Sequence, residues 1–161
     1  MSLIVRPAEP RDAALVMALI RELADYERLA HEVDADEAAI QAALFGPGPR
    51  VFCDVAEWEG AAAGFALWFY SFSTFRGRHG VYLEDLFVRP AFRGKGIGKV
   101  LLKGLARRCE AENLARLEWS VLDWNEPALA FYRAVGAVAL DGWTVHRLTG
   151  EALARFAGDR S

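Results

Sequence analysis

A six-residue stretch, RGKGIG at residues 93–98, constrains this chain more than any other because it joins two different kinds of element. The run GVYLEDLFV at 80–88 predicts a β-strand that Pro90 ends, and residues 99–112 have helical periodicity. Glycines let backbone N–H groups approach an anion, and the positive end of a helix dipole adds to the attraction. We therefore expect a strand, an anion-binding turn and a helix in succession, with a diphosphate as the natural guest.

The other elements alternate between strand and helix patterns. Strands are predicted at 3–8, 51–58, 62–72, 116–124 and 142–150, and helices at 13–29, 126–135 and, more briefly, 151–157. Asp34 with Glu37 resembles a capping box that opens a further helix, and GPGP stops this helix after Phe45. Early hairpins followed by β-α-β units predict a single α/β domain over 1–161, with a mixed, mostly antiparallel twisted sheet and helices on both faces.

Composition narrows the classes of function. The chain is 53% hydrophobic and 25% charged with a net charge of -3, which fits one globular core and argues against general electrostatic binding of nucleic acid. No run approaches the roughly 20 apolar residues that cross a bilayer, so we expect no membrane partner and a cytoplasmic location. Cys53, Cys109 and the three scattered histidines show no metal-ligand spacing, so we expect no metal and two buried, packing cysteines.

The glycine-rich stretch excludes two better-known phosphate loops, because it gives neither the Gly-Lys-Ser/Thr ending of one nor the G-x-G-x-x-G spacing of the other. It matches R-x-x-G-x-G, and with the preceding EDLFVRPAFRG it resembles the pyrophosphate-binding signature of the GNAT superfamily of N-acetyltransferases. The alternative is that the glycines only shape a tight turn, with Lys95, Lys99 and Lys103 solvated.

The segment NEPALAFYRAVGA, from Asn125, resembles the second signature of the same superfamily. Asn125, Ala128 and Tyr132 share one helix face because seven residues make nearly two turns. Taken alone, Asn125 reads as a helix cap and Tyr132 as a half-buried aromatic residue. The two signatures in the correct order favour the acetyltransferase interpretation.

The resemblance implies acetyl-CoA as cofactor. Backbone amides of the turn would hold its diphosphate, Arg93 and the lysines would add charge, and the strand before the turn would offer main-chain groups to the pantetheine arm. Residues of the second signature would contact the cofactor from the other side. The implied cofactor-binding set is Leu86, Phe87, Val88, Arg93, Gly94, Lys95, Gly96, Ile97, Gly98, Lys99, Asn125, Pro127, Ala128 and Tyr132.

Further stretches, IRELADYE, YLED and WNEP, resemble the diamine acetyltransferase subfamily, which includes spermidine/spermine and thialysine acetyltransferases. This resemblance implies a homodimer that acetylates a small primary amine, either a diamine, a polyamine or a lysine-like amino acid. The implied acceptor-binding residues are Tyr26, Glu27, Glu84, Asp85 and Glu118. Glu118 and Asp141 match weakly, since the residue type differs at 118 and the loop before Trp143 is shorter here.

A primary ammonium with a pKa of about 10 must lose a proton before it attacks a thioester, so we expect Glu84 to act as the base. Tyr132 is the expected acid for the departing thiolate, and a main-chain N–H at 86–88 is expected to bind the thioester oxygen. Neither cysteine has a cue for an activated nucleophile, which favours direct attack in a ternary complex.

The acceptor is less well defined by the sequence. Arg76 and Arg78 precede the strand of Glu84 and would repel polycations, favouring an acceptor with a carboxylate, unless they face solvent or a second subunit. Two other functions remain open at this point: a coenzyme A-binding sensor without catalysis, and an acetyltransferase for a protein N-terminus or an antibiotic amine.

Overall fold

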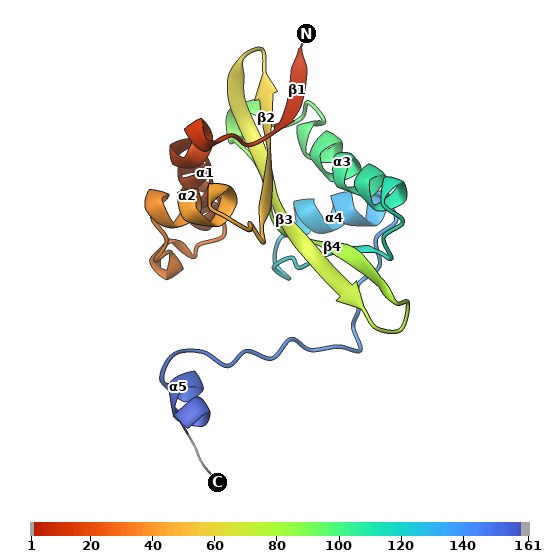
Figure 1. Ribbon diagram of the computed structural model, residues 1–161. Helices are drawn as coiled ribbons and strands as arrows, with labels where there is room; N and C mark the ends of the chain where they lie inside the picture. Colours follow the sequence, from red (N-terminus) through yellow and green to blue (C-terminus); the bar gives the residue numbers. More distant parts are fainter. Residues whose placement is uncertain (1, 159–161) are drawn as a thin grey trace. The chain divides into compact units, whose positions relative to one another are not determined.

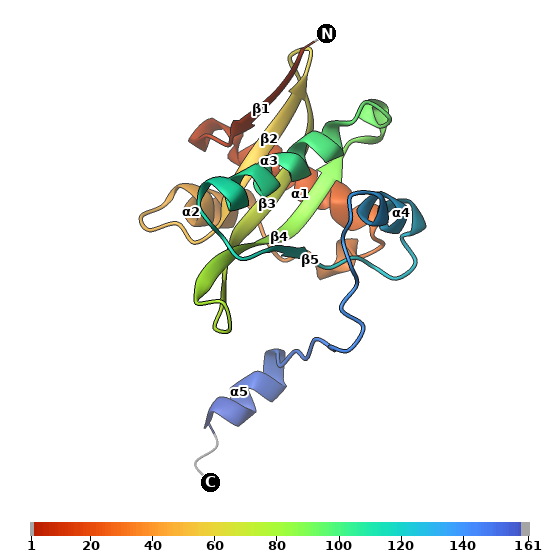
Figure 2. The same cartoon turned by 90° about the vertical axis from the view of Figure 1, so that its right-hand side faces the viewer.

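The computed structural model describes residues 2–158 and contains a five-stranded sheet (Figures 1 and 2). The strands are β1 (Leu3–Pro7), β2 (Phe52–Trp58), β3 (Ala61–Ser73), β4 (Arg78–Val88) and β5 (Leu117–Trp119), in the order β1-β2-β3-β4-β5. Pairing is antiparallel from β1 to β4 and parallel between β4 and β5. The predicted mixed, mostly antiparallel sheet is confirmed.

Helices cover both faces of the sheet, as predicted. Helices α1 (Ala13–Tyr26) and α2 (Glu37–Phe45) lie on one face and α3 (Ile97–Ala111) on the other (Figure 1). The cap of α2 is Asp36 rather than Asp34, since its carboxylate accepts a hydrogen bond from Ala39 N at 2.8 Å. Short 3-10 turns occupy Pro10–Asp12, Ala30–Glu32 and Pro90–Phe92.

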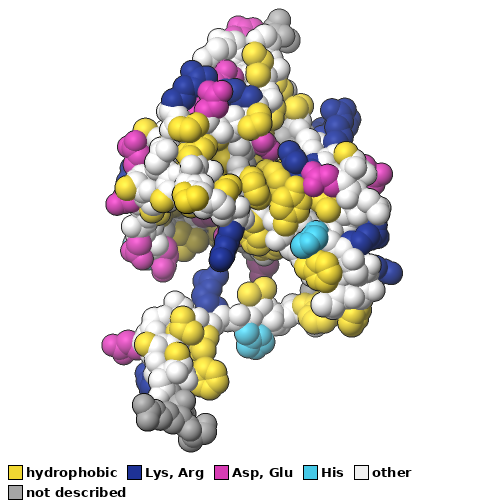
Figure 3. All heavy atoms as spheres, viewed as in Figure 1, with side chains coloured by type: hydrophobic (Ala, Val, Ile, Leu, Met, Phe, Trp, Pro, Cys, Tyr) yellow, Lys and Arg dark blue, Asp and Glu magenta, His cyan; other side chains and the backbone are white. Residues whose placement is uncertain are grey.

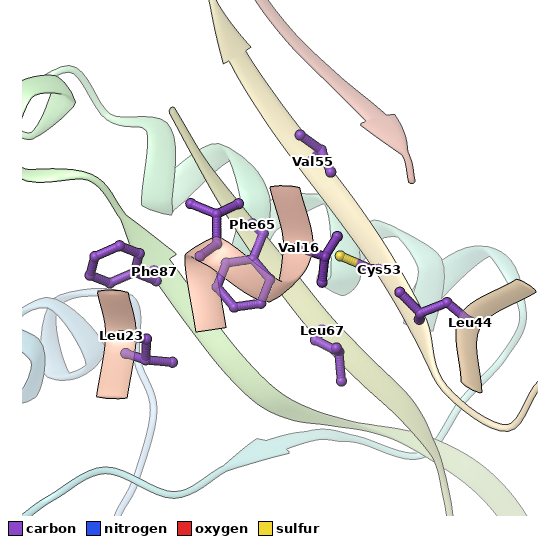
Figure 4. Packing of buried hydrophobic residues seen from close by; sticks show 9 residues of the cluster. Val16, Leu23, Leu44, Cys53, Val55, Phe65, Leu67 and Phe87 are labelled. Atoms are coloured by element: carbon purple, nitrogen blue, oxygen red, sulfur yellow. The ribbon is translucent and has the colours of Figure 1, made fainter. Parts of the chain in front are cut away.

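The core under α1 and α2 consists of side chains from three strands and both helices (Figure 4). Each fully buried aliphatic or aromatic side chain contributes about 1.5–3 kcal/mol relative to exposure. Cys53 is one of these core residues, and burial raises the pKa of its thiol far above the ordinary value. Its packing role is therefore confirmed. The cluster comprises Val16, Leu19, Leu23, Leu44, Cys53, Val55, Phe65, Leu67 and Phe87.

The inner face of α3 consists of only part of its apolar side chains. Leu101, Leu105 and Cys109 are buried, whereas Val100 is 42% exposed. Val100 follows Gly96 by one helical turn at the open end of α3, where the Val100 amide makes the first helical hydrogen bond to Gly96 O at 3.0 Å. Its side chain therefore lies outside the core stripe.

An irregular register in β4 determines where its side chains lie. Leu67 of β3 pairs with Asp85 while the next residue, Trp68, pairs with Leu83, so Glu84 is an extra residue in β4. Such a β-bulge bends the strand and re-aims side chains. Nearer the end of β4, a Cβ added at Gly64 would lie 2.4 Å from Phe87 O, so only glycine allows β3 to pack this closely against β4.

The chain divides into two compact units, residues 1–122 and 123–161. The second contains α4 (Glu126–Ala134) and α5 (Gly150–Gly158). The strand predicted at 142–150 is wrong, since residues 135–149 form neither helix nor strand and Trp143 and Val145 are 82% and 83% exposed. A β-pattern becomes a strand only when its backbone finds a hydrogen-bonded neighbour, and the structure shows none for this segment within the described residues.

Candidate active site

The glycine turn, residues 93–98, has the backbone conformation that an anion site requires. Gly94 and Gly96 have φ of +79° and +78°, a region that L side chains rarely adopt. A Cβ at either position would meet no heavy atom within 4 Å. These glycines are therefore needed for their conformation, and the space beside them is open.

The first turn of α3 completes this site. Gly96 is its N-cap, and no side chain in the described chain caps it. The amides of Ile97, Gly98 and Lys99 therefore precede the first helical hydrogen bond and can donate to an anion. The side chain of Ile97 is only 1% exposed and packs in the core, where it anchors the helix. Ile97 can therefore contact a ligand only through its backbone amide.

Two cations of the turn are positioned by aromatic rings. Arg93 Nε donates to Val88 O at 3.0 Å, and Arg93 Cζ lies 4.9 Å from the ring centroid of Tyr26 and 5.7 Å from that of Phe87. On the β2 side, Lys95 Nζ lies 5.1 Å from the centroid of Trp58. Arg93 therefore connects the turn to α1 and β4, whereas Lys95 connects it to β2.

The strand that leads into the turn has an open edge. Pairing between β4 and β5 ends at Leu83 and Trp119, whereas pairing with β3 continues to Val88. Among residues 2–158, Leu86–Val88 thus have a strand neighbour on one side only, which is the arrangement an added extended chain needs. The pantetheine contact predicted for these residues remains a prediction.

Three carboxylates, which we call the acidic cluster, lie near enough to the bulge for two of them to repel the third: Glu27 after α1 and Glu84 in β4 both act on Asp85 in β4. Burial raises the pKa of Asp85 to about 7, and repulsion from Glu84 and Glu27 adds to the rise. Burial also raises the pKa of Glu27. No basic side chain in residues 2–158 forms an ion pair with any of the three. The cluster can therefore attract a cationic ligand and accept its proton.

Sequence comparison decides the family. Residues 15–137 match the acetyltransferase (GNAT) family. The chain belongs to this family. It is 39% identical to thialysine N-epsilon-acetyltransferase of Bos taurus, with 96% of each chain covered, and 29% identical to L-ornithine N5-acetyltransferase of Arabidopsis thaliana, covering 92% of this chain and 85% of that one. Among solved structures, an integron cassette protein of V. cholerae matches with a TM-score of 0.81 and 29% identity over 99% of both chains.

The protein is thus a GNAT N-acetyltransferase whose acetyl donor is acetyl-CoA. The glycine turn fits the diphosphate of this cofactor, because its amides, its open space and its nearby cations lie together in one unit. No helix among residues 2–158 is long and apolar enough to span a membrane. No set of three or more His, Cys, Asp or Glu side chains in that range is arranged to hold a metal ion.

Other residues predicted for the GNAT acceptor site have partners elsewhere. Glu118 forms an ion pair with Arg116, with Oε1 and Nε 2.8 Å apart. Arg78 donates to Asn113 Oδ1 at 2.9 Å, in the turn after α3, and six residues of strand, about 20 Å, separate it from Glu84. Of the two orientations left open for Arg78, this contact favours the one in which its side chain points away from Glu84. Arg76 lies exposed in the turn between β3 and β4.

The second GNAT signature forms α4, as predicted. Asn125 Oδ1 accepts a hydrogen bond from Ala128 N at 3.4 Å, so the capping role considered for Asn125 is confirmed. Pro127 occupies the first turn, where its missing N–H costs nothing. Asn125, Ala128 and Tyr132 share a face of this helix. Their contacts with the cofactor, and the contact of Asp141 with the acceptor, stay predictions.

Sequence reasoning missed three features of the site: the bulge at Glu84, Trp58 beside the turn, and the contact of Arg93 with Tyr26. Trp58 and Tyr26 lie tens of residues from the turn, so no local pattern could have revealed them. The adjacent YLED acids gave the one available signal, because two consecutive carboxylates in an otherwise apolar strand break its alternation.

Proposed function

We propose that this enzyme transfers the acetyl group to a primary amine of a small molecule, either a diamine, a polyamine or a thialysine- or lysine-like amino acid. The observation that carries the proposal is the acidic cluster, with which no basic side chain among residues 2–158 forms an ion pair, at the strand that leads into the anion-binding turn. An ammonium would satisfy that cluster. The two similar acetyltransferases named above, which act on thialysine and on ornithine, favour an amino-acid acceptor.

In this proposal, separate residues bind the cofactor and accept the proton. Backbone amides from Gly94 to Lys99 hold the diphosphate, with charge from Arg93, Lys95 and Lys99. Acetyl-CoA supplies an acetyl group activated as a thioester. Glu84 takes the proton from the acceptor ammonium, directly or through water. Asp85 is the second candidate for this step, since a pKa of about 7 leaves it partly ionised at neutral pH.

Direct transfer in a ternary complex is supported by the cysteines. Burial raises the pKa of both Cys53 and Cys109, so neither supplies the thiolate that a covalent route needs. Tyr132 donates a proton to the departing thiolate, and a main-chain N–H within Leu86–Val88 binds the thioester oxygen as negative charge develops there. Amine nitrogen attacks the acetyl carbon without an acetylated enzyme.

The experiment that tests this function is a coenzyme A release assay with thialysine, lysine, ornithine, diamines, polyamines and short peptides. We expect amino acids with a side-chain amine to give the highest kcat/KM. Tight coenzyme A binding without release for any amine would favour a cofactor sensor, and peptides as the best acceptors would move the function to protein acetylation.

Tyr132→Phe should lower kcat with coenzyme A affinity retained. Unchanged turnover at every pH would remove Tyr132 from the mechanism.

We also propose one domain over residues 1–161 and a homodimer. The family match over 15–137 crosses the division between the two units, which supports one domain.

The homodimer is supported by exposed apolar side chains. Large apolar side chains lie exposed from residue 138 to 156, and yellow side chains are visible on α5 in Figure 3; a second copy would cover this surface. They are Val138, Leu140, Trp143, Val145, Leu148, Leu153 and Phe156. Sedimentation equilibrium should give twice the monomer mass, and a monomer at micromolar concentration would contradict this.

A further inference from the structure

We infer that Arg93 connects the cofactor turn to the acceptor pocket, so that occupation of one site strengthens binding at the other. The inference rests on the proposed function in one respect, which is that Tyr26 and Glu27 face the acceptor. It concerns a property that neither site has alone.

The contacts of Arg93 reach three elements. Its main chain begins the glycine turn, Nε donates to the last carbonyl of β4 at 3.0 Å, and Cζ lies over the ring of Tyr26, the last residue of α1, 4.9 Å from its centroid. Phe87 borders the same guanidinium at 5.7 Å. One side chain thus connects the turn with the residue next to Glu27 of the acidic cluster.

The guanidinium can contact Tyr26 and bind an anion at the same time. It carries five N–H donors in a planar fork, and Nε is the one that donates a hydrogen bond within residues 2–158, while Cζ lies within cation–π distance of the two rings. The Nη1 and Nη2 donors remain for a phosphate oxygen. An anion held by these donors restrains the guanidinium over Tyr26, and an ordered Tyr26 in turn keeps the guanidinium at the turn. The coupling is therefore positive and, by linkage, reciprocal.

Lys95 provides a matched control within the same turn. It also places a cation over a ring, but that ring is Trp58 of β2 rather than an acceptor-side residue. Removing Lys95 should weaken cofactor binding by its own charge without affecting how Tyr26 influences that binding.

The test measures coenzyme A affinity by calorimetry in a double-mutant cycle, which needs no acceptor. Tyr26→Leu should weaken coenzyme A binding about two- to five-fold, the range of an exposed cation–π contact, although Tyr26 lies outside the turn. Tyr26→Phe keeps the ring and should retain wild-type affinity. The effect of Tyr26→Leu should vanish in an Arg93→Met background and persist in full in a Lys95→Met background. Thermal unfolding confirms that each variant is folded.

A second measurement uses the amine with the highest kcat/KM in the release assay. Its affinity should rise several-fold when coenzyme A is bound, and this rise should disappear in Arg93→Met but not in Lys95→Met. Tyr26→Leu with wild-type coenzyme A affinity, or with the same loss in the Arg93→Met background, would overturn the inference even if acetyl transfer is intact. Absence of acetyl transfer with an intact cycle would instead contradict the proposed function alone.

Discussion

The glycine turn and the acidic cluster are separated by only a few residues of chain, yet they are built in different ways. The turn acts through its own backbone, with two glycines at positive φ and the uncapped amides of α3. The cluster acts through carboxylates, and one of them, Glu27, comes from the end of α1, far away in sequence. The comparison teaches that local sequence determines the first site, whereas the second depends on tertiary structure.

The largest expected effect separates the two acids of the bulge. If Glu84 is the base, Glu84→Gln should lower kcat/KM for the amine by roughly 10²–10⁴-fold, the usual contribution of a positioned proton acceptor. Coenzyme A affinity should stay unchanged, since the turn is built from backbone. Asp85→Asn should mainly raise KM for the amine. The opposite pattern in steady-state kinetics would assign the base to Asp85.

The turn should respond to a change of backbone rather than of charge. Gly96→Ala places a side chain at φ +78°, which costs about 1–2 kcal/mol, and adds a methyl group beside the amides. The free turn should relax away from this strained conformation, and coenzyme A must then restore it, so we expect its affinity to fall about ten-fold, because 1.4 kcal/mol corresponds to a factor of ten. Gly104→Ala is the control, since this glycine lies inside α3 with open space around it and alanine favours helix. Equal calorimetric affinities for both variants would show that the turn is not the cofactor site.

The family signatures and most elements could be predicted because they depend on short-range periodicity and turn chemistry. RGKGIG before α3 and NEP at the start of α4 are examples. The features that could not be predicted share a physical cause. Residues 142–150 have a strand pattern without a strand neighbour among residues 2–158, and the orientation of Arg78 stayed open until the structure showed its contact with Asn113 at the other end of β4 from Glu84. Both outcomes depend on which distant backbone or side chain lies alongside, and a local pattern does not contain that information.

Stability should reveal the buried acid through its pH dependence. The folded pKa of Asp85, about 7, lies above the ordinary 3.8, so the folded state binds the proton more tightly than the unfolded state. The proton bound to Asp85 therefore stabilises the folded state fully below pH 3.8, and this stabilisation is lost as the pH rises through about 7. Asp85→Asn should raise the free energy of unfolding by up to about 4 kcal/mol at pH 8, since the rise spans about three pKa units at about 1.4 kcal/mol each, and leave it unchanged at pH 3.

Urea unfolding of wild type and Asp85→Asn at both pH values measures this difference. Glu59→Gln, an exposed acid at the tip of the β2–β3 hairpin, is a suitable control that should show no such dependence. A constant difference between wild type and Asp85→Asn across the pH range would show that Asp85 is not desolvated in solution.

The smallest effect concerns the connection between the two parts of the acidic cluster. Arg89, directly after β4, makes a bidentate ion pair with Glu22 of α1, at 3.0 Å from Nε to Oε1 and 2.9 Å from Nη2 to Oε2, and also donates to Ala62 O at 3.1 Å. Both side chains are partly exposed, so Arg89→Met should lower the free energy of unfolding by only about 0.5–1 kcal/mol, and less at high salt. Arg11→Met removes a more exposed pair with Glu9 and should not measurably change the free energy of unfolding.

The same ion pair should also affect the amine. Because Glu22 lies one helical turn before Tyr26, Arg89→Met should raise KM for the amine while coenzyme A affinity is retained. A loss confined to coenzyme A affinity would place the effect of Arg89 in the turn instead, and the cluster would then not depend on α1 in the way its geometry indicates.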